Sequence, residues 1–131
     1  MTTATAEGLR QRESSVDGVG VFAERTFQPG NVIARIVEYE SFGAPRRGSV
    51  QLTPTVHVID PAIMRWVNHS CIPNIEIVFD GQLIELRALR MIPAGEELLC
   101  DYLNTEDSIP VPFPCRCGNC GGEAIRGRSS R

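Results

Sequence analysis

Three short segments of the chain bring together residue types that can bind a metal, hold a cofactor or position a reacting group. Residues 68–74 read Asn-His-Ser-Cys-Ile-Pro-Asn and place an amide, an imidazole and a thiol beside two turn-forming residues. Residues 95–102 read Gly-Glu-Glu-Leu-Leu-Cys-Asp-Tyr, and residues 115–120 read Cys-Arg-Cys-Gly-Asn-Cys. A loop needs turn chemistry, but it rarely needs such a set of polar side chains. The three segments therefore indicate a functional site.

The cysteines predict a zinc site near the end of the chain. Three of the five, Cys115, Cys117 and Cys120, lie within six residues. In a cytosolic protein this spacing favours a metal over a disulfide, and structural zinc takes four thiolate or imidazole ligands. The fourth ligand must come from elsewhere, and the candidates are Cys71, Cys100, His57 and His69. Cys71 is preferred because it lies in a turn within residues 68–74; reduced thiols without a metal are the alternative.

The elements that position these segments are predicted to be short strands. The patterns indicate strands at residues 18–23, 31–37, 56–60 and 97–102, a hairpin of residues 75–79 and 83–87 around Asp80-Gly81, one or two helical turns at 61–67 and a loop at 41–55. Gly and Pro are frequent, and no long amphipathic helix is visible. We therefore expect a mainly β domain.

Length and charge narrow the class of protein further. The 131 residues suffice for one domain, and no apolar run approaches the roughly 18 residues of a membrane span. Residues 1–18 show no signal peptide, so we expect a soluble, intracellular protein, cytoplasmic or, in a eukaryote, nuclear. Residues 1–110 hold fifteen carboxylates against nine Arg. Such a surface suits a basic peptide and disfavours direct nucleic-acid binding.

The segments resemble the motifs of the SET domain, the lysine methyltransferase module. Residues 68–74 resemble its central motif, residues 95–102 its second motif, and residues 18–23 (Gly-Val-Gly-Val-Phe-Ala) its opening glycine motif. Residues 115–118 resemble the cysteine-rich post-SET segment. The resemblance divides the chain into an N-terminal extension (1–17), a SET domain (18–104), a post-SET-like cysteine segment (105–122) and an Arg-rich tail (123–131).

The resemblance implies both a fold and an activity. The fold is β-clip-like, with several short sheets, a zinc-stapled C-terminal segment, and a knot-like crossing of residues 68–74 with 95–102. The activity is transfer of a methyl group from S-adenosylmethionine to the ε-amine of a lysine in a protein substrate. A non-catalytic SET-fold binding module is one alternative, and a methyltransferase acting on a non-lysine amine is another.

Individual roles also follow from the resemblance. The backbone of Gly18, Val19 and Gly20 would contact the cofactor, Asn68 and His69 would hold its amino acid and adenine portions, and Tyr102 would stand beside the reacting methyl group. Cys71, Cys115, Cys117 and Cys120 would hold zinc.

The chain departs from the family in three places. Only residues 41–55 stand where family members often carry a substrate-binding insertion, so the peptide groove is open, or a partner protein or second subunit completes it. Cys117 and Cys120 are closer together than is usual. Cys100 stands where the family often has an aromatic residue. Its smaller side chain would leave room for more than one methyl group. Tyr39 is expected to line, together with Cys100, the channel that receives the substrate lysine.

Overall fold

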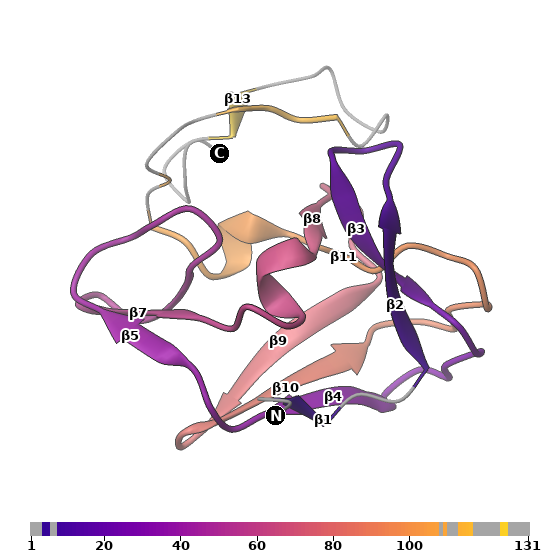
Figure 1. Cartoon of the computed structure of the whole chain (residues 1–131), viewed down its shortest axis with the longest axis horizontal. Helices are drawn as coiled ribbons and strands as arrows, with labels where there is room; N and C mark the ends of the chain where they lie inside the picture. The colour runs from indigo at the N-terminus through magenta and orange to yellow at the C-terminus, as the bar shows by residue number, and fades with distance from the viewer. Residues whose placement is uncertain (1–3, 6–7, 108, 110–112, 117–123, 126–131) are drawn as a thin grey trace.

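The computed structural model describes residues 4–5, 8–107, 109, 113–116 and 124–125, and it shows a mainly β chain of several small sheets (Figure 1). The largest sheet has the antiparallel order β1-β4-β10-β9, formed by Ala4–Thr5, Val32–Ile36, Leu83–Ala88 and Ile75–Asp80. A three-stranded sheet has the order β5-β7-β6, formed by Glu40–Phe42, Val56–Ile59 and Val50–Thr53. The predicted mainly β class is confirmed.

Three two-stranded sheets and two 3-10 turns complete the described chain. The sheets pair β2 (Leu9–Glu13) with β3 (Val19–Ala23), β8 (Asn68–His69) with β11 (Leu99–Cys100), and β12 (Phe113–Pro114) with β13 (Ala124–Ile125). The turns are η1 (Met64–Trp66) and η2 (Tyr102–Asn104). No helix in these described stretches has the length and apolar character needed to cross a membrane.

The sheets surround one hydrophobic core. Strands β4, β9 and β10 lie along one side, the β2–β3 hairpin and the β5–β7 pair flank them, and β8 runs between (Figure 1). Every sheet except β12–β13 contributes apolar side chains to this core; the largest that are fully buried in the core are Phe27, Ile36, Ile75, Ile84, Leu86, Ile92 and Leu98. A separate small cluster of Leu103, Cys115 and Ile125 packs the C-terminal segment onto the domain.

Most predicted elements are present in the structure. Strands β3, β4 and β7 lie within the predicted ranges 18–23, 31–37 and 56–60, and Met64–Trp66 forms the helical turn predicted within residues 61–67. The β9–β10 hairpin is also confirmed, although Leu83 pairs with Asp80, so the two turn residues are Gly81 and Gln82. Gly81 has a φ of 61°, a conformation in which a side chain is strained.

Two predictions of local structure are wrong. Residues 41–55, predicted as a loop, contain most of β5 and all of β6, because both strands form by pairing with β7, a partner that local Gly and Pro content does not reveal. The strand predicted at residues 97–102 is only Leu99–Cys100. The Asp101 carboxylate accepts a hydrogen bond from the Leu103 amide, which starts η2 and turns Tyr102 out of the strand.

Candidate cofactor and metal site

The site is built where residues 68–74 and 95–102 lie side by side. Strands β8 and β11 pair in parallel, with Asn68 opposite Leu99 and His69 opposite Cys100. Beyond the strands, the Ser70 amide donates to the Cys100 carbonyl at 3.0 Å. The two segments that stood out in the sequence therefore share one backbone ladder; the knot-like crossing implied by the resemblance stays a prediction.

Asn74 locks the two segments together. Its amide nitrogen donates to the Glu97 carbonyl at 2.7 Å and to a Glu96 carboxylate oxygen at 2.9 Å, and its oxygen accepts from the Leu99 amide at 2.7 Å. The side chain is 1% exposed. From the sequence Asn74 was interpreted only as a turn former, and nothing but its place in the motif could have indicated this role.

The Asn68 side chain lies among three hydrogen-bond acceptors, the Asp17 carbonyl, the Val19 carbonyl and the Glu97 carboxylate. We call this group the acceptor-rich corner. The amide nitrogen of Asn68 lies 2.9 Å from the Asp17 carbonyl, 2.9 Å from Glu97 Oε2 and 3.3 Å from the Val19 carbonyl. A side-chain amide has two N–H donors, so three oxygens compete for them. The corner has acceptor capacity and negative charge to spare, a combination that suits a positively charged amino group.

Gly20 allows the Glu97 carboxylate to enter this corner. A Cβ atom at residue 20 would overlap Glu97 Oε2 and lie 2.8 Å from its Cδ, so only glycine permits this approach. Ser14 donates to the other carboxylate oxygen at 2.7 Å. Gly18 has a φ of 45°, which also favours glycine. Glu97 was not singled out in the sequence, although it lies within residues 95–102.

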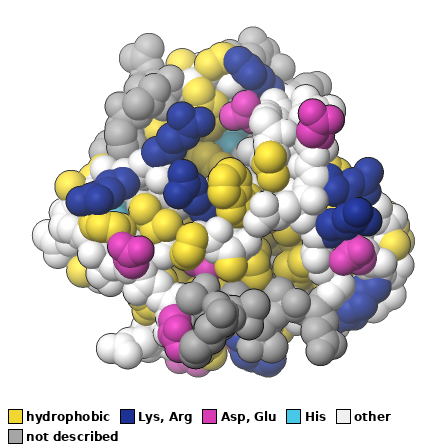
Figure 2. Space-filling view, viewed as in Figure 1, with side chains coloured by type: hydrophobic (Ala, Val, Ile, Leu, Met, Phe, Trp, Pro, Cys, Tyr) yellow, Lys and Arg dark blue, Asp and Glu magenta, His cyan; other side chains and the backbone are white. Residues whose placement is uncertain are grey.

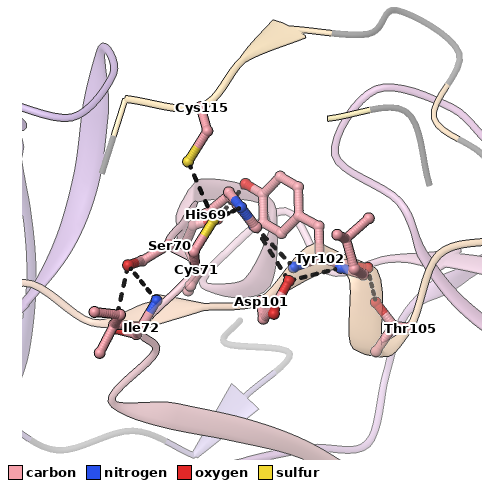
Figure 3. Close-up of polar contacts among 10 residues, drawn as sticks. His69, Ser70, Cys71, Ile72, Asp101, Tyr102, Thr105 and Cys115 are labelled. Atoms are coloured by element: carbon pink, nitrogen blue, oxygen red, sulfur yellow. Dashed lines mark hydrogen bonds and ion pairs between the residues drawn. The ribbon is translucent and has the colours of Figure 1, made fainter. Parts of the chain in front are cut away.

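His69, Cys71 and Cys115 form a second cluster (Figure 3). Their ligand atoms lie within 4.8 Å of one another, with Cys71 Sγ 3.5 Å from Cys115 Sγ and 3.7 Å from His69 Nε2. The cluster thus brings together the preferred fourth ligand, Cys71, and the tail cysteine Cys115.

The spacing of the two sulfurs fits tetrahedral zinc. Zinc–sulfur bonds of about 2.3 Å at tetrahedral angles separate two sulfurs by about 3.8 Å, close to the observed 3.5 Å. Neither Cys100 nor His57 belongs to the described cluster. Burial raises the pKa of the Cys100 thiol to about 12, which opposes the thiolate that zinc needs. Cys117 and Cys120 lie outside the described residues.

Tyr102 packs directly against this cluster. Its ring centroid lies 5.2 Å from that of His69 and 5.9 Å from that of Phe113 in β12, and its hydroxyl donates to the Val67 carbonyl at 2.6 Å. Burial raises the pKa of the Tyr102 phenol well above its ordinary value, and the negative charge of nearby groups, Asp17 among them, raises it further. Tyr102 therefore presents a protonated hydroxyl and cannot act as a phenolate base near neutral pH.

The sequence pattern of the family described as "SET domain" matches residues 18–103. The chain belongs to the SET domain family. Its relatives include protein-lysine N-methyltransferase SMYD4 of Mus musculus, 33% identical over 49% of this chain and 9% of that protein. N-lysine methyltransferase SMYD2-A of Xenopus laevis is 39% identical over 47% of this chain and 16% of that protein. Methyltransferase flvH of Aspergillus flavus is 38% identical over 56% of this chain and 43% of that protein. The chain spans less than half the length of each.

Two cavities of this SET domain involve the predicted channel residues Cys100 and Tyr39. The first, of about 420 Å³, is lined by Cys100, Asp101 and Thr105 together with Gln51, Leu52 and Glu76 among others. The second, of about 500 Å³, shares Leu52 with the first and contains Tyr39. The Tyr39 hydroxyl donates to the Gln82 carbonyl at 2.7 Å. The structure thus places Cys100 and Tyr39 on adjacent cavities, and the shared channel predicted for them stays a prediction.

The surface of the SET domain has a recess on the face that Figure 2 shows. Figure 2 shows a depression with hydrophobic side chains in it and a histidine visible at its base, while arginine and acidic side chains stand around it. An exposed ion pair of 3.7 Å joins Arg116, next to Cys115, to Asp17 in the loop before β3. The cysteine segment and the glycine motif therefore meet beside the site.

Proposed function

We propose that this SET domain transfers methyl groups from S-adenosylmethionine to the ε-amine of lysine in a protein substrate. The observation that carries the proposal is the pairing of β8 with β11, which holds Asn68 beside the glycine motif and Tyr102 just beyond Cys100. Relatives of the chain are named lysine N-methyltransferases, in agreement with this assignment. Nothing in the described residues favours a binding module or a non-lysine amine.

The acceptor-rich corner would hold the amino acid portion of the cofactor. The Asp17 and Val19 carbonyls and Glu97 Oε2 offer three oxygens to a positively charged amino group, and the backbone of residues 18–20 is open to close approach. The His69 side chain is 1% exposed, so its contact with an adenine ring would involve the backbone. When bound, the cofactor supplies a methyl group on an electrophilic sulfonium.

Tyr102 would orient the lysine amine and would not deprotonate it. Its hydroxyl is protonated and directed at the Val67 carbonyl, and alignment supplies much of the acceleration of an in-line displacement. The amine must arrive neutral, and exclusion of water lowers a lysine pKa by disfavouring the ammonium form. The amine lone pair forms the new nitrogen–carbon bond as the sulfur–carbon bond breaks.

Zinc would staple the cysteine segment to the domain. We assign the ligands as Cys71, Cys115, Cys117 and Cys120, of which the first two have the sulfur spacing that zinc requires. The metal would thereby hold β12, and with it Phe113, against Tyr102.

The first cavity is the proposed entrance for the substrate. It borders Cys100, two residues before Tyr102, and its lining includes the carboxylates of Glu76 and Asp101 but no Arg. A lysine in a basic peptide fits such a wall. The small Cys100 side chain leaves room for more than one methyl group. A partner protein or second subunit would complete the groove beside β6, and the expected intracellular location belongs to the same proposal.

The test is transfer of a labelled methyl group from S-adenosylmethionine to a protein extract. Wild-type protein should label the extract, Tyr102→Phe should label it far less, and an extract whose lysines are chemically blocked should remain unlabelled. Equal labelling of the blocked extract would show that the acceptor is not lysine. If no extract is labelled and titration calorimetry detects no cofactor binding, the chain is a binding module.

A further inference from the structure

We propose that His69 is a positioning residue that connects Cys71 to Tyr102 through its two ring nitrogens. The three candidate ligand atoms of the second cluster make a zinc site with a histidine ligand an obvious alternative. The hydrogen bonds around the imidazole decide between the two. Only the consequence for Tyr102 rests on the proposed function; the contacts of His69 do not.

The first step concerns Nδ1. The backbone nitrogen of Tyr102 lies 3.0 Å from His69 Nδ1. A backbone N–H can only donate, so Nδ1 must present its lone pair and carry no proton. Asp101 Oδ1 lies 3.7 Å from the same nitrogen, too far for a hydrogen bond, and it accepts from the Leu103 amide at 3.0 Å. The hydrogen bond that Nδ1 makes is therefore the one it accepts from the Tyr102 amide.

The second step concerns Nε2. A neutral imidazole carries one proton, which must be on Nε2 because Nδ1 is an acceptor. Nε2 lies 3.7 Å from Cys71 Sγ, so its N–H is directed at the sulfur (Figure 3). Metal coordination would need a lone pair on this same nitrogen. With Nδ1 engaged by Tyr102, Nε2 donates to the Cys71 sulfur and leaves the metal to sulfur ligands.

The third step is the consequence for Tyr102. The His69 ring is 1% exposed and packs against Tyr102 and Phe113, with centroid distances of 5.2 and 6.0 Å. The Tyr102 amide is held by His69 and its hydroxyl by the Val67 carbonyl. A displacement of Cys71 would therefore reach Tyr102 through one rigid ring. Outer contacts of this kind typically change metal affinity by about 10- to 100-fold.

Two substitutions separate the two contacts. In His69→Asn the side-chain oxygen takes the place of Nδ1 and can accept from the Tyr102 amide, but the side chain is too short for Cys71. In His69→Gln the amide nitrogen takes the place of Nε2 and can donate to Cys71, while the acceptor for Tyr102 is lost. Cobalt(II) is the metal probe, because its absorption spectrum reports the number of sulfur ligands, and nitrogen NMR reports the imidazole tautomer.

The expected result is an Nε2–H tautomer in the cobalt-free protein and the same all-sulfur cobalt spectrum in wild type and both variants. Cobalt affinity should fall about tenfold in His69→Asn and stay within about threefold of wild type in His69→Gln. The Tyr102 amide proton signal should move in His69→Gln and stay in place in His69→Asn. These readouts do not depend on methyl transfer, so an inactive wild type would overturn the proposed function alone.

A cobalt spectrum with a nitrogen ligand that disappears in His69→Asn would overturn the proposal, as would an Nδ1–H tautomer. Should both variants lose their circular dichroism, the tautomer and the cobalt spectrum of the wild-type protein decide the matter by themselves.

Discussion

The hydroxyl of Tyr102 donates a 2.6 Å hydrogen bond to the carbonyl of Val67, the residue immediately before β8. This bond connects the tyrosine of residues 95–102 to the residue that precedes residues 68–74. The backbone amide of the same tyrosine donates to His69 Nδ1. Tyr102 is therefore fixed at both ends, by groups from one short strand and its approach. Such fixed placement is the property that a residue orienting a reaction needs.

Replacing Tyr102 with Phe should separate orientation from folding. The loss of the hydroxyl leaves the Val67 carbonyl without this partner, which should cost about 1–3 kcal/mol of unfolding free energy. Methyl transfer should fall about 100-fold, because the amine loses an orienting group. Single-turnover kinetics and denaturant unfolding measure the two effects. A variant that keeps the wild-type turnover rate would remove Tyr102 from the proposed mechanism.

Gly20→Ala should damage the acceptor-rich corner and little else. The new Cβ would overlap the Glu97 carboxylate and displace it from Asn68 and Ser14. Affinity for S-adenosylmethionine should fall about tenfold or more, corresponding to about 1.4 kcal/mol. The matched control is Gly43→Ala, since a Cβ there meets no atom within 4 Å and the backbone φ is not in the left-handed region. Titration calorimetry should show weakened cofactor binding for Gly20→Ala and wild-type binding for Gly43→Ala. Equal affinities of the two variants would contradict this account of the acceptor-rich corner.

Asn74→Asp should be strongly destabilising. The carboxylate keeps the acceptor for the Leu99 amide but replaces an N–H donor with a charge facing the Glu96 carboxylate and the Glu97 carbonyl. For a side chain that is 1% exposed, a loss of about 3 kcal/mol or more is expected. Asn31→Asp is the control, because the exposed Asn31 oxygen only accepts from the Gln28 amide, a role that Asp can take over. Urea unfolding should show a large shift of the midpoint for the first variant and a small one for the second.

The buried thiol of Cys100 predicts a loss of stability in alkaline solution. Burial raises the pKa of this thiol from 9.0 to about 12, so above pH 9 the unfolded chain releases a proton that the folded protein keeps. The unfolded state then binds fewer protons, and the free energy of unfolding falls as pH rises from about 9 towards 12. Urea unfolding between pH 7 and 10.5 should show this fall, and it should be shallower in Cys100→Ser, whose hydroxyl does not ionise there. Parallel pH profiles would mean that Cys100 ionises as readily in the folded protein as in the unfolded chain.

Sequence patterns were sufficient for the parts of this fold that depend on local chemistry. The β9–β10 hairpin follows from alternating apolar residues around a glycine that takes a positive φ, and β3, β4 and β7 follow from β-branched runs. Strands β5 and β6 were missed because their stability comes from β7. Pairing partners distant in sequence leave no local pattern in a Gly- and Pro-rich stretch.

The same division holds at the site. The resemblance to the SET-domain motifs predicted roles for Asn68, Cys71 and Tyr102, and its position in a turn also favoured Cys71 as a ligand. Glu97 was missed, because its role depends on the space left by Gly20, from which it is far in sequence. The orientation of the His69 ring was also beyond prediction, since the Tyr102 amide comes from the opposite segment. Residue types thus indicate which chemistry is possible, whereas the contacts between segments distant in sequence become known only from the structure.

Removal of the metal should loosen the C-terminal segment and weaken cofactor binding together. Cys71→Ser takes away the sulfur that lies 3.5 Å from Cys115, so zinc bound per chain should drop, and chelator should have the same effect on wild type. Phe113 and Cys115 would then lose their hold beside Tyr102 and His69, which should raise amide exchange at residues 113–116 and lower cofactor affinity about tenfold. The control is Cys100→Ser, because the Cys100 thiol lies outside the cluster. This variant should bind as much zinc per chain as the wild type. If Cys71→Ser retains both zinc and cofactor affinity, the cysteine cluster and the cofactor corner are independent, and the staple has no part in binding.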